Sequence, residues 1–261
     1  MPTALPQPMR NTRVLSLALN LPGPAALMRC ARMGAECTKL EPPPAPGYPS
    51  ADPMGIYSPA AYATLHDGVR VVHAHLKTPE GQAALHDELV RTDVLITSFR
   101  PSALTKLGLG WDALQAKYPR LSLVRIVGAA AERAEEPGHD LTYLADAGLV
   151  TGTEMPPTLY ADMGGALMAS EAVLQALLER AHTGSGVCIE VALADAAAWL
   201  AQPRHWGLTT PDGDVGGHHA GYRIYPCADG RVAVAALEPH FAASLCAAAG
   251  LPATGDPQVL R

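Results

Sequence analysis

Short apolar segments alternate with helical patterns through most of the chain, and this alternation constrains the fold more than any other feature. The segments predicted as strands are 14–19, 36–40, 93–97, 121–127 and 187–193. Helical patterns accompany them at 24–33, 79–90, 101–107, 109–118, 166–181 and 194–200. Elements in this order form βαβ units with parallel strands. The sequence therefore predicts an α/β fold with a Rossmann-like, doubly wound, mainly parallel sheet.

Local signals mark several boundaries. Thr78 followed by Pro79 predicts a helix start, because a threonine can cap the first turn and a proline there loses no hydrogen bond. Segment 41–59 contains seven prolines and no helical period, which predicts a loop over the carboxyl end of a strand. Residues 1–12 are polar and proline-containing, which predicts a loose tail.

The pattern changes after Pro203. A glycine-rich segment, 211–221, predicts a linker, and Ala228-Asp229-Gly230 predicts a hairpin turn between strands 222–226 and 231–236. A last helix is expected at 239–249. We therefore expect a large α/β domain over residues 1–202 and a smaller, shortened α+β domain over residues 203–261.

Composition excludes several classes of function. The net charge of −6 comes without a basic block, which argues against a nucleic-acid partner. No apolar run is long enough to span a membrane. The five cysteines are scattered and form no C-x-x-C motif, which indicates reduced thiols and a cytoplasmic protein.

Motifs for common cofactors are missing from the sequence. No G-x-G-x-x-G motif follows a predicted strand, so we predict no nicotinamide or flavin site. His73 and His75 would share one face of a strand, but no Cys, Asp or Glu cluster completes a ligand set. We therefore predict no metal and interpret that segment as an edge strand.

Two titratable residues stand in glycine-flanked segments and form the candidate site. His139 lies within 138–144, and Asp162 lies just before a helix expected to begin near Ala166. A carboxylate and an imidazole that share a site can exchange protons with a ligand. The pattern leaves a second interpretation open, in which Asp162 is only a helix N-cap and His139 only a loop residue.

An ordered set of motifs lies between about Arg13 and Leu251. The motifs are Pro22-Gly23-Pro24, Gly34-Ala35-Glu36, Lys39-Leu40-Glu41-Pro42-Pro43, Lys77-Thr78-Pro79-Glu80-Gly81, Phe99-Arg100-Pro101, Leu107-Gly108-Leu109-Gly110, Thr183-Gly184-Ser185-Gly186 and Cys227-Ala228-Asp229-Gly230-Arg231. In order and spacing this set resembles the family III CoA-transferases (CaiB/BaiF). This family includes the carnitine and bile-acid CoA-transferases, formyl-CoA transferase and alpha-methylacyl-CoA racemase.

The racemase branch is the most similar, because Gly138-His139-Asp140 followed by Tyr143 matches its histidine segment. The resemblance implies that His139 and Asp162 are the two bases of a 1,1-proton transfer, which inverts the 2-methyl centre of an acyl-CoA thioester. It also implies that Glu238 pairs with His139. Alternatively, Glu238 is an ordinary acid in the first turn of a helix.

Two other functions stay open. In the transferases the aspartate at the position of Asp162 is a nucleophile, which forms a covalent aspartyl-CoA intermediate. The third possibility is a degraded CoA-binding homologue without activity. Three departures from the family favour it: segment 65–70 lacks the usual basic run, segment 127–132 replaces a Ser-Gly-Phe-Gly-Gln loop, and the sequence stops at Arg261 where relatives continue.

The resemblance also implies contacts and partners. Coenzyme A is expected as part of the substrate, with no redox or metal cofactor, and the large domain is expected to bind it. Lys39, Arg70 and Arg100 are candidate phosphate contacts, with ordinary solvated charge as the alternative. Backbone N–H groups near Asp140, or at the helix start beyond Asp162, are candidates for stabilising an oxyanion. Many relatives form interlocked dimers, so we expect a homodimer.

Overall fold

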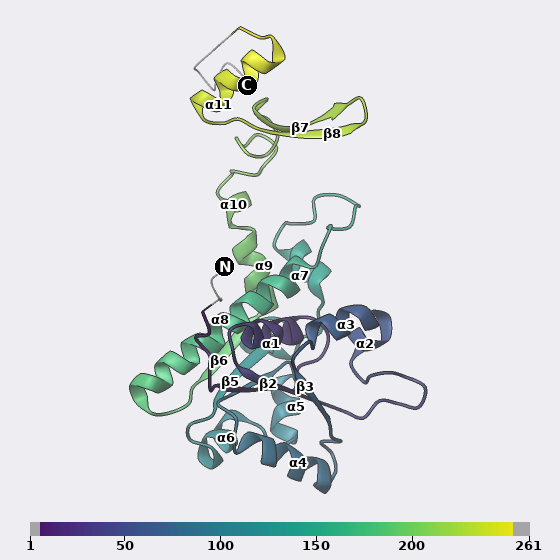
Figure 1. The fold of residues 1–261 in the computed structure, drawn as a ribbon, viewed down its shortest axis with the longest axis vertical. Helices are drawn as coiled ribbons and strands as arrows, with labels where there is room; N and C mark the ends of the chain where they lie inside the picture. The colour runs from purple at the N-terminus through teal and green to yellow at the C-terminus, as the bar shows by residue number, and fades with distance from the viewer. Residues whose placement is uncertain (1–5, 253–261) are drawn as a thin grey trace. The chain divides into compact units, whose positions relative to one another are not determined.

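Six parallel strands form the central sheet of the computed structural model, which describes residues 6–252. Their order across the sheet is β3-β2-β1-β4-β5-β6 (Figure 1). The strands are β1 (Arg13–Ser16), β2 (Glu36–Glu41), β3 (Arg70–His73), β4 (Val94–Thr97), β5 (Ser122–Val127) and β6 (Cys188–Ala192). The predicted α/β fold with a mainly parallel sheet is confirmed.

Helices cover both faces of this sheet. On one face Val14 and Ile96 pack in a buried cluster with Leu27 of α1 (Pro22–Arg32) and with α8 (Tyr160–Thr183). On the other face Leu15 and Leu95 pack with α4 (Pro79–Leu89), α5 (Pro101–Lys106) and α6 (Trp111–Lys117). Neighbouring strand residues enter different clusters because successive side chains point to opposite faces. Each fully buried aliphatic side chain stabilises the fold by about 1.5–3 kcal/mol.

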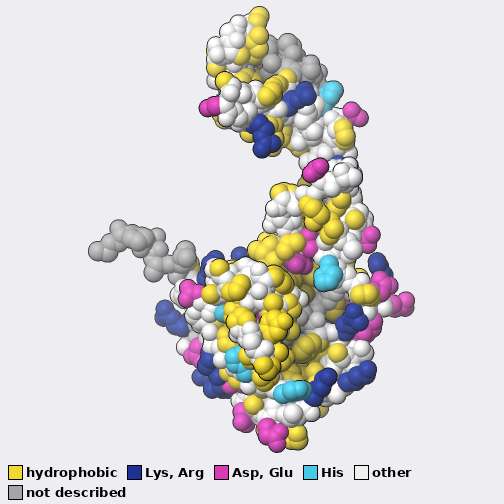
Figure 2. All heavy atoms as spheres, turned by 90° about the vertical axis from the view of Figure 1, so that its right-hand side faces the viewer, with side chains coloured by type: hydrophobic (Ala, Val, Ile, Leu, Met, Phe, Trp, Pro, Cys, Tyr) yellow, Lys and Arg dark blue, Asp and Glu magenta, His cyan; other side chains and the backbone are white. Residues whose placement is uncertain are grey.

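Shorter helices surround the carboxyl ends of the strands. Their bounds are α2 (Pro53–Tyr57), α3 (Pro59–Leu65), the 3₁₀ helix η1 (Ala131–Glu135), α7 (Asp140–Asp146) and α9 (Leu193–Leu200). Helix α10 (Gln202–His205) lies beyond residue 199, in a separate compact unit. Figure 2 views the molecule from the side of α2 and α3, which lie at the right in Figure 1, and hydrophobic side chains gather in the middle of that face. Helix α2 contributes two exposed hydrophobic residues, Ile56 and Tyr57.

The chain divides into two compact units, residues 1–199 and 200–261. In the second unit β7 (Tyr222–Cys227) and β8 (Gly230–Ala235) pair as an antiparallel hairpin, and α11 (Pro239–Ala249) follows. The predicted hairpin and final helix are thereby confirmed. The assignment of CoA binding to the first unit stays a prediction.

Three predictions about the fold were wrong. Residues 6–12 are not a loose tail: Met9 is fully buried in the core and its N–H donates to the Met33 carbonyl, while residues 1–5 lie outside the described part. Segment 41–59 is not all loop, because it contains α2, too short to display a helical period. Helix α8 begins at Tyr160, six residues before the predicted start.

The edge position of β3, next to β2 alone, is confirmed. Within residues 6–252, no helix is both long enough and apolar enough to cross a membrane.

Removing the cap of α4 should destabilise the large unit. The Thr78 hydroxyl accepts a hydrogen bond from the Gly81 N–H at 3.1 Å, as the sequence predicted. Thr78→Ala leaves this N–H without its protein acceptor, so we expect the free energy of unfolding to fall by about 1 kcal/mol in urea titrations. Thr105→Ala, on the exposed surface of α5, is the matched control and should change it by less than about 0.5 kcal/mol. Equal effects of the two substitutions would contradict the capping role.

Candidate active site

The reversal of strand order between β1 and β4 creates a pocket at the carboxyl ends of the strands. The chain leaves β1 toward α1 on one face and leaves β4 toward α5 on the other, so the loops diverge and leave a crevice. A pocket of about 630 Å³ lies there. Its lining includes Leu19 and Asn20 after β1, Ser98 and Arg100 after β4, and Gly128 after β5.

Asp162 reaches this pocket from the first turn of α8. The Asp162 N–H donates to Oδ1 of Asp140 at 3.0 Å, which ties the start of α8 to the start of α7. Leu159, not Asp162, occupies the N-cap position, so the interpretation of Asp162 as an N-cap was wrong. The carboxyl group of Asp162 is therefore available to the pocket.

The environment of Asp162 raises the pKa of its carboxyl to about 6. Burial is the main cause of this upward shift, because a carboxylate removed from water is disfavoured. The negative charge of nearby Asp140 raises the pKa further, whereas the imidazole of His139 lowers it. A carboxyl with such a pKa can both take up and release protons near neutral pH.

His139 lines the same pocket from the residue before α7. Its backbone is fixed by Thr142, whose hydroxyl accepts from the His139 N–H at 3.1 Å and donates to the His139 carbonyl at 2.7 Å. The residue is exposed and lines the pocket. The structure thus brings His139 and Asp162 to one cavity; their catalytic roles stay predictions.

The other predicted site residues are distributed differently. Arg100 and Asp140 line the pocket, and Asp140 is buried. Arg70 lies on the edge strand β3 and donates to Glu88 at 2.5 Å and to Thr38 at 3.0 Å, away from the pocket lining. Glu238 precedes α11 in the second unit with its side chain exposed, and its pairing with His139 stays a prediction.

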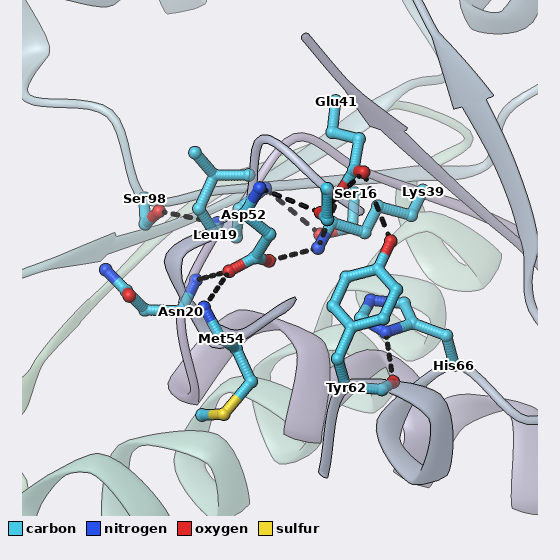
Figure 3. Close-up of polar contacts among 12 residues, drawn as sticks. Ser16, Leu19, Asn20, Lys39, Glu41, Asp52, Met54, Tyr62, His66 and Ser98 are labelled. Carbon is cyan, nitrogen blue, oxygen red and sulfur yellow. Dashed lines mark hydrogen bonds and ion pairs between the residues drawn. The ribbon is translucent and has the colours of Figure 1, made fainter. Parts of the chain in front are cut away.

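Lys39 is not presented to a ligand, which corrects its assignment as a phosphate contact. Its side chain on β2 is completely buried, and its ammonium group lies between two buried carboxylates (Figure 3). It lies 3.1 Å from Oε2 of Glu41 and bonds Oδ2 of Asp52. The ammonium also stands 5.0 Å from the ring centroid of Tyr62.

Sequence reasoning missed Asp52, which connects this buried charge to the pocket wall. Its Oδ1 accepts from the Met54 N–H at 2.9 Å, capping α2, and from the Asn20 N–H at 3.0 Å (Figure 3). The Tyr57 hydroxyl then donates to Oδ1 of Asn20 at 3.1 Å. Since Asn20 and Tyr57 line the pocket, the Lys39–Asp52 pair holds that wall in place. The cap signal Asp52-Pro53 was present in the sequence.

Among residues 6–252, no group of three or more His, Cys, Asp or Glu side chains is arranged to hold a metal ion. His73, considered above for metal binding, instead places Nε2 3.3 Å from Oε1 of Glu41.

Comparisons with known proteins agree on one family. The family model CoA-transferase family III matches residues 9–260. Human alpha-methylacyl-CoA racemase is 30% identical over 93% of this chain and 65% of its own length. Succinate–glutarate CoA-transferase of Agrobacterium fabrum is 32% identical over 98% of this chain and 70% of its own length.

Solved structures give the same result. A hypothetical protein from Mycobacterium tuberculosis has a TM-score of 0.79 at 27% identity, over 95% of this chain and 71% of its own. A CAIB/BAIF family protein from Brucella suis has a TM-score of 0.76 at 25% identity, over 94% of this chain and 70% of its own. The chain spans between 54% and 70% of the lengths of the curated relatives it matches.

Removing the buried ammonium should destabilise the protein strongly. Lys39→Met leaves Glu41 and Asp52 buried without their shared cation, so the free energy of unfolding should fall by about 3–5 kcal/mol in urea titrations. The exposed Lys77→Met is the matched control and should change it by less than about 0.5 kcal/mol. A loss below about 1 kcal/mol for Lys39→Met would contradict this role.

The titration of Asp162 should be visible by carboxyl ¹³C NMR, with a midpoint near pH 6. Asp140→Asn should lower this pKa because it removes a neighbouring negative charge, and His139→Ala should raise it. Between pH 4 and 6 the folded protein holds a proton on Asp162 that the unfolded chain releases. The free energy of unfolding should therefore fall as the pH rises from 4 to 6, and it should fall less in Asp162→Asn. A midpoint at or below pH 4 would contradict the proposed desolvation.

Proposed function

We propose that this chain, which belongs to CoA-transferase family III, inverts the 2-methyl centre of an acyl-CoA thioester by two-base proton transfer. The family contains racemases and CoA-transferases, so the chain belongs to an enzyme family that acts on CoA thioesters. The observation that supports racemisation is the shared pocket of His139 and Asp162.

Inversion requires one base on each side of the α-carbon. One base takes the α-proton, and the electrons of the C–H bond move into the carbonyl to give an enolate. The second group returns a proton to the opposite face, which restores the thioester with inverted configuration. His139 and Asp162 serve as the two bases, and they exchange roles when the reaction runs in the other direction.

The properties of the two side chains favour this assignment. The pKa of about 6 for Asp162 lies close to neutral pH, where a proton carrier is most effective. The imidazole of His139 projects from a backbone fixed by Thr142 and is exposed in the pocket lining, so it can approach a substrate. We also assign to Arg100, at the pocket rim, a contact with the CoA phosphates.

A second candidate function is CoA transfer. The position of Asp162 in the pocket supports it, and relatives named as CoA-transferases are as similar to this chain as the racemase is. In that reaction the Asp162 carboxylate attacks the donor thioester. This attack displaces CoA thiolate and leaves an acyl-aspartyl anhydride. The thiolate attacks the aspartyl carbonyl, giving aspartyl-CoA and the free donor acid. The acceptor carboxylate then attacks aspartyl-CoA and displaces CoA thiolate, which attacks the acceptor carbonyl of the new anhydride to give the product thioester and free Asp162.

Deuterium exchange separates these functions. A 2-methylacyl-CoA incubated with the protein in heavy water should gain deuterium at the α-carbon and lose its optical purity, as measured by mass spectrometry and chiral chromatography. Asp162→Ala and His139→Ala should each lower the rate by about 10²–10⁴-fold, which is typical for the loss of a general acid or base. Asp112→Ala and His182→Ala, both exposed and outside the pocket lining, are matched controls and should keep the rate.

Other outcomes would favour the alternatives. A hydroxylamine-sensitive CoA adduct on Asp162, formed without deuterium exchange, would establish the transferase reaction. With neither signal, the chain would be a degraded homologue, and calorimetry would measure whether it still binds CoA. The homodimer stays a prediction from the resemblance, and sedimentation would measure it.

A further inference from the structure

We propose that Tyr143 is a further catalytic residue, whose hydroxyl donates a hydrogen bond to the thioester oxygen as the enolate forms. The inference rests on the proposed function, since it names the group that stabilises the enolate of that reaction. The two bases account for the movement of the proton, but neither stabilises the negative charge that forms on the thioester oxygen. A hydrogen-bond donor aimed at this oxygen usually contributes a large part of the rate enhancement.

Tyr143 is positioned by the backbone around it. It lies on α7, is only 8% exposed, and lines the pocket together with His139 and Asp162. Its hydroxyl end fits against two glycines: a Cβ at Gly128 would stand 2.2 Å from the hydroxyl oxygen, and a Cβ at Gly138 2.3 Å. Any larger residue at either position would displace the tyrosine, so these two glycines make room for the phenol at the pocket.

The hydroxyl of Tyr143 is free to serve a ligand. Within residues 6–199, no hydrogen bond to its oxygen is present, although the side chain is more than nine-tenths buried. The other tyrosine that lines the pocket, Tyr57, differs in this respect, because its hydroxyl already donates to Asn20. The hydroxyl oxygen itself is not sealed off from solvent. A substrate oxygen in the pocket can therefore accept its hydrogen bond.

One nearby backbone donor is already engaged. The Asp162 N–H at the start of α8 is already bonded to Asp140. The phenol of Tyr143 stays protonated near neutral pH. Burial raises its pKa most, and the negative charge of Asp162 raises it further. The phenol therefore donates without transferring its proton, and proton movement stays with His139 and Asp162.

The experiment is α-deuterium exchange of a 2-methylacyl-CoA, compared between the unsubstituted chain and Tyr143→Phe. We expect kcat to fall about 100-fold while KM changes less than about threefold, since the donor acts mainly on the enolate and not on the bound thioester. Tyr118→Phe is the matched control: its hydroxyl bonds His86 at 2.7 Å, outside the pocket lining, and the exchange rate should not change. An unchanged kcat in folded Tyr143→Phe would overturn the inference.

A second substitution keeps the test decisive if Tyr143→Phe unfolds. Fluorotyrosine at position 143 keeps the shape of the ring and makes the phenol more acidic. The alkaline limb of the pH–rate profile should then move to lower pH, because the donor is lost when the phenol ionises; an unmoved limb would overturn the inference. If the unsubstituted chain exchanges no deuterium, the proposed function itself fails, whereas a failure confined to the Tyr143 variants leaves that function standing.

Discussion

The reversal of strand order between β1 and β4 is the constraint on which the candidate site depends. Neighbouring strands in a parallel sheet usually send their following helices to the same face, and the loops then close over the sheet edge. Here the chain goes to opposite faces after β1 and after β4, so the segments beyond Ser16 and Thr97 separate. A long hydrogen bond connects them: the Leu19 N–H donates to the Ser98 hydroxyl at 3.4 Å (Figure 3).

One wall of this crevice is held by a charge inside the protein. An ammonium group without water is tolerated only where opposite charges surround it, and Lys39 meets this condition through Glu41 and Asp52. Asp52 in turn fixes Asn20 by accepting its backbone N–H. A proline-rich segment with little regular structure is thereby connected to the rigid sheet. Aliphatic side chains in the same place would fill the volume but would not orient that backbone.

Another part of the pocket lining places two acidic groups close together. Asp140 and Asp162 meet at the starts of α7 and α8, where helix N-termini favour negative charge, yet burial disfavours it. The balance is a carboxyl at Asp162 that titrates near pH 6 beside a carboxylate that accepts a backbone N–H. Tyr143 and His139 also line the pocket, from one short helix and the residue before it. Asp162, His139 and Tyr143 therefore face one cavity from the starts of two helices.

The sequence by itself determined the alternation of strands and helices, the Thr78 cap, the final hairpin and helix, and the candidates His139 and Asp162. These follow from signals within a few residues: side-chain period, capping residues and family motifs. Only the tertiary structure decided that Lys39 is buried, that residue Met9 belongs to the core, and that α8 starts at Tyr160. Each of these depends on a partner distant in the chain, such as Asp52 for Lys39, Met33 for Met9 and Asp140 for the start of α8. Local pattern carries no information about such partners, because folding alone brings them together.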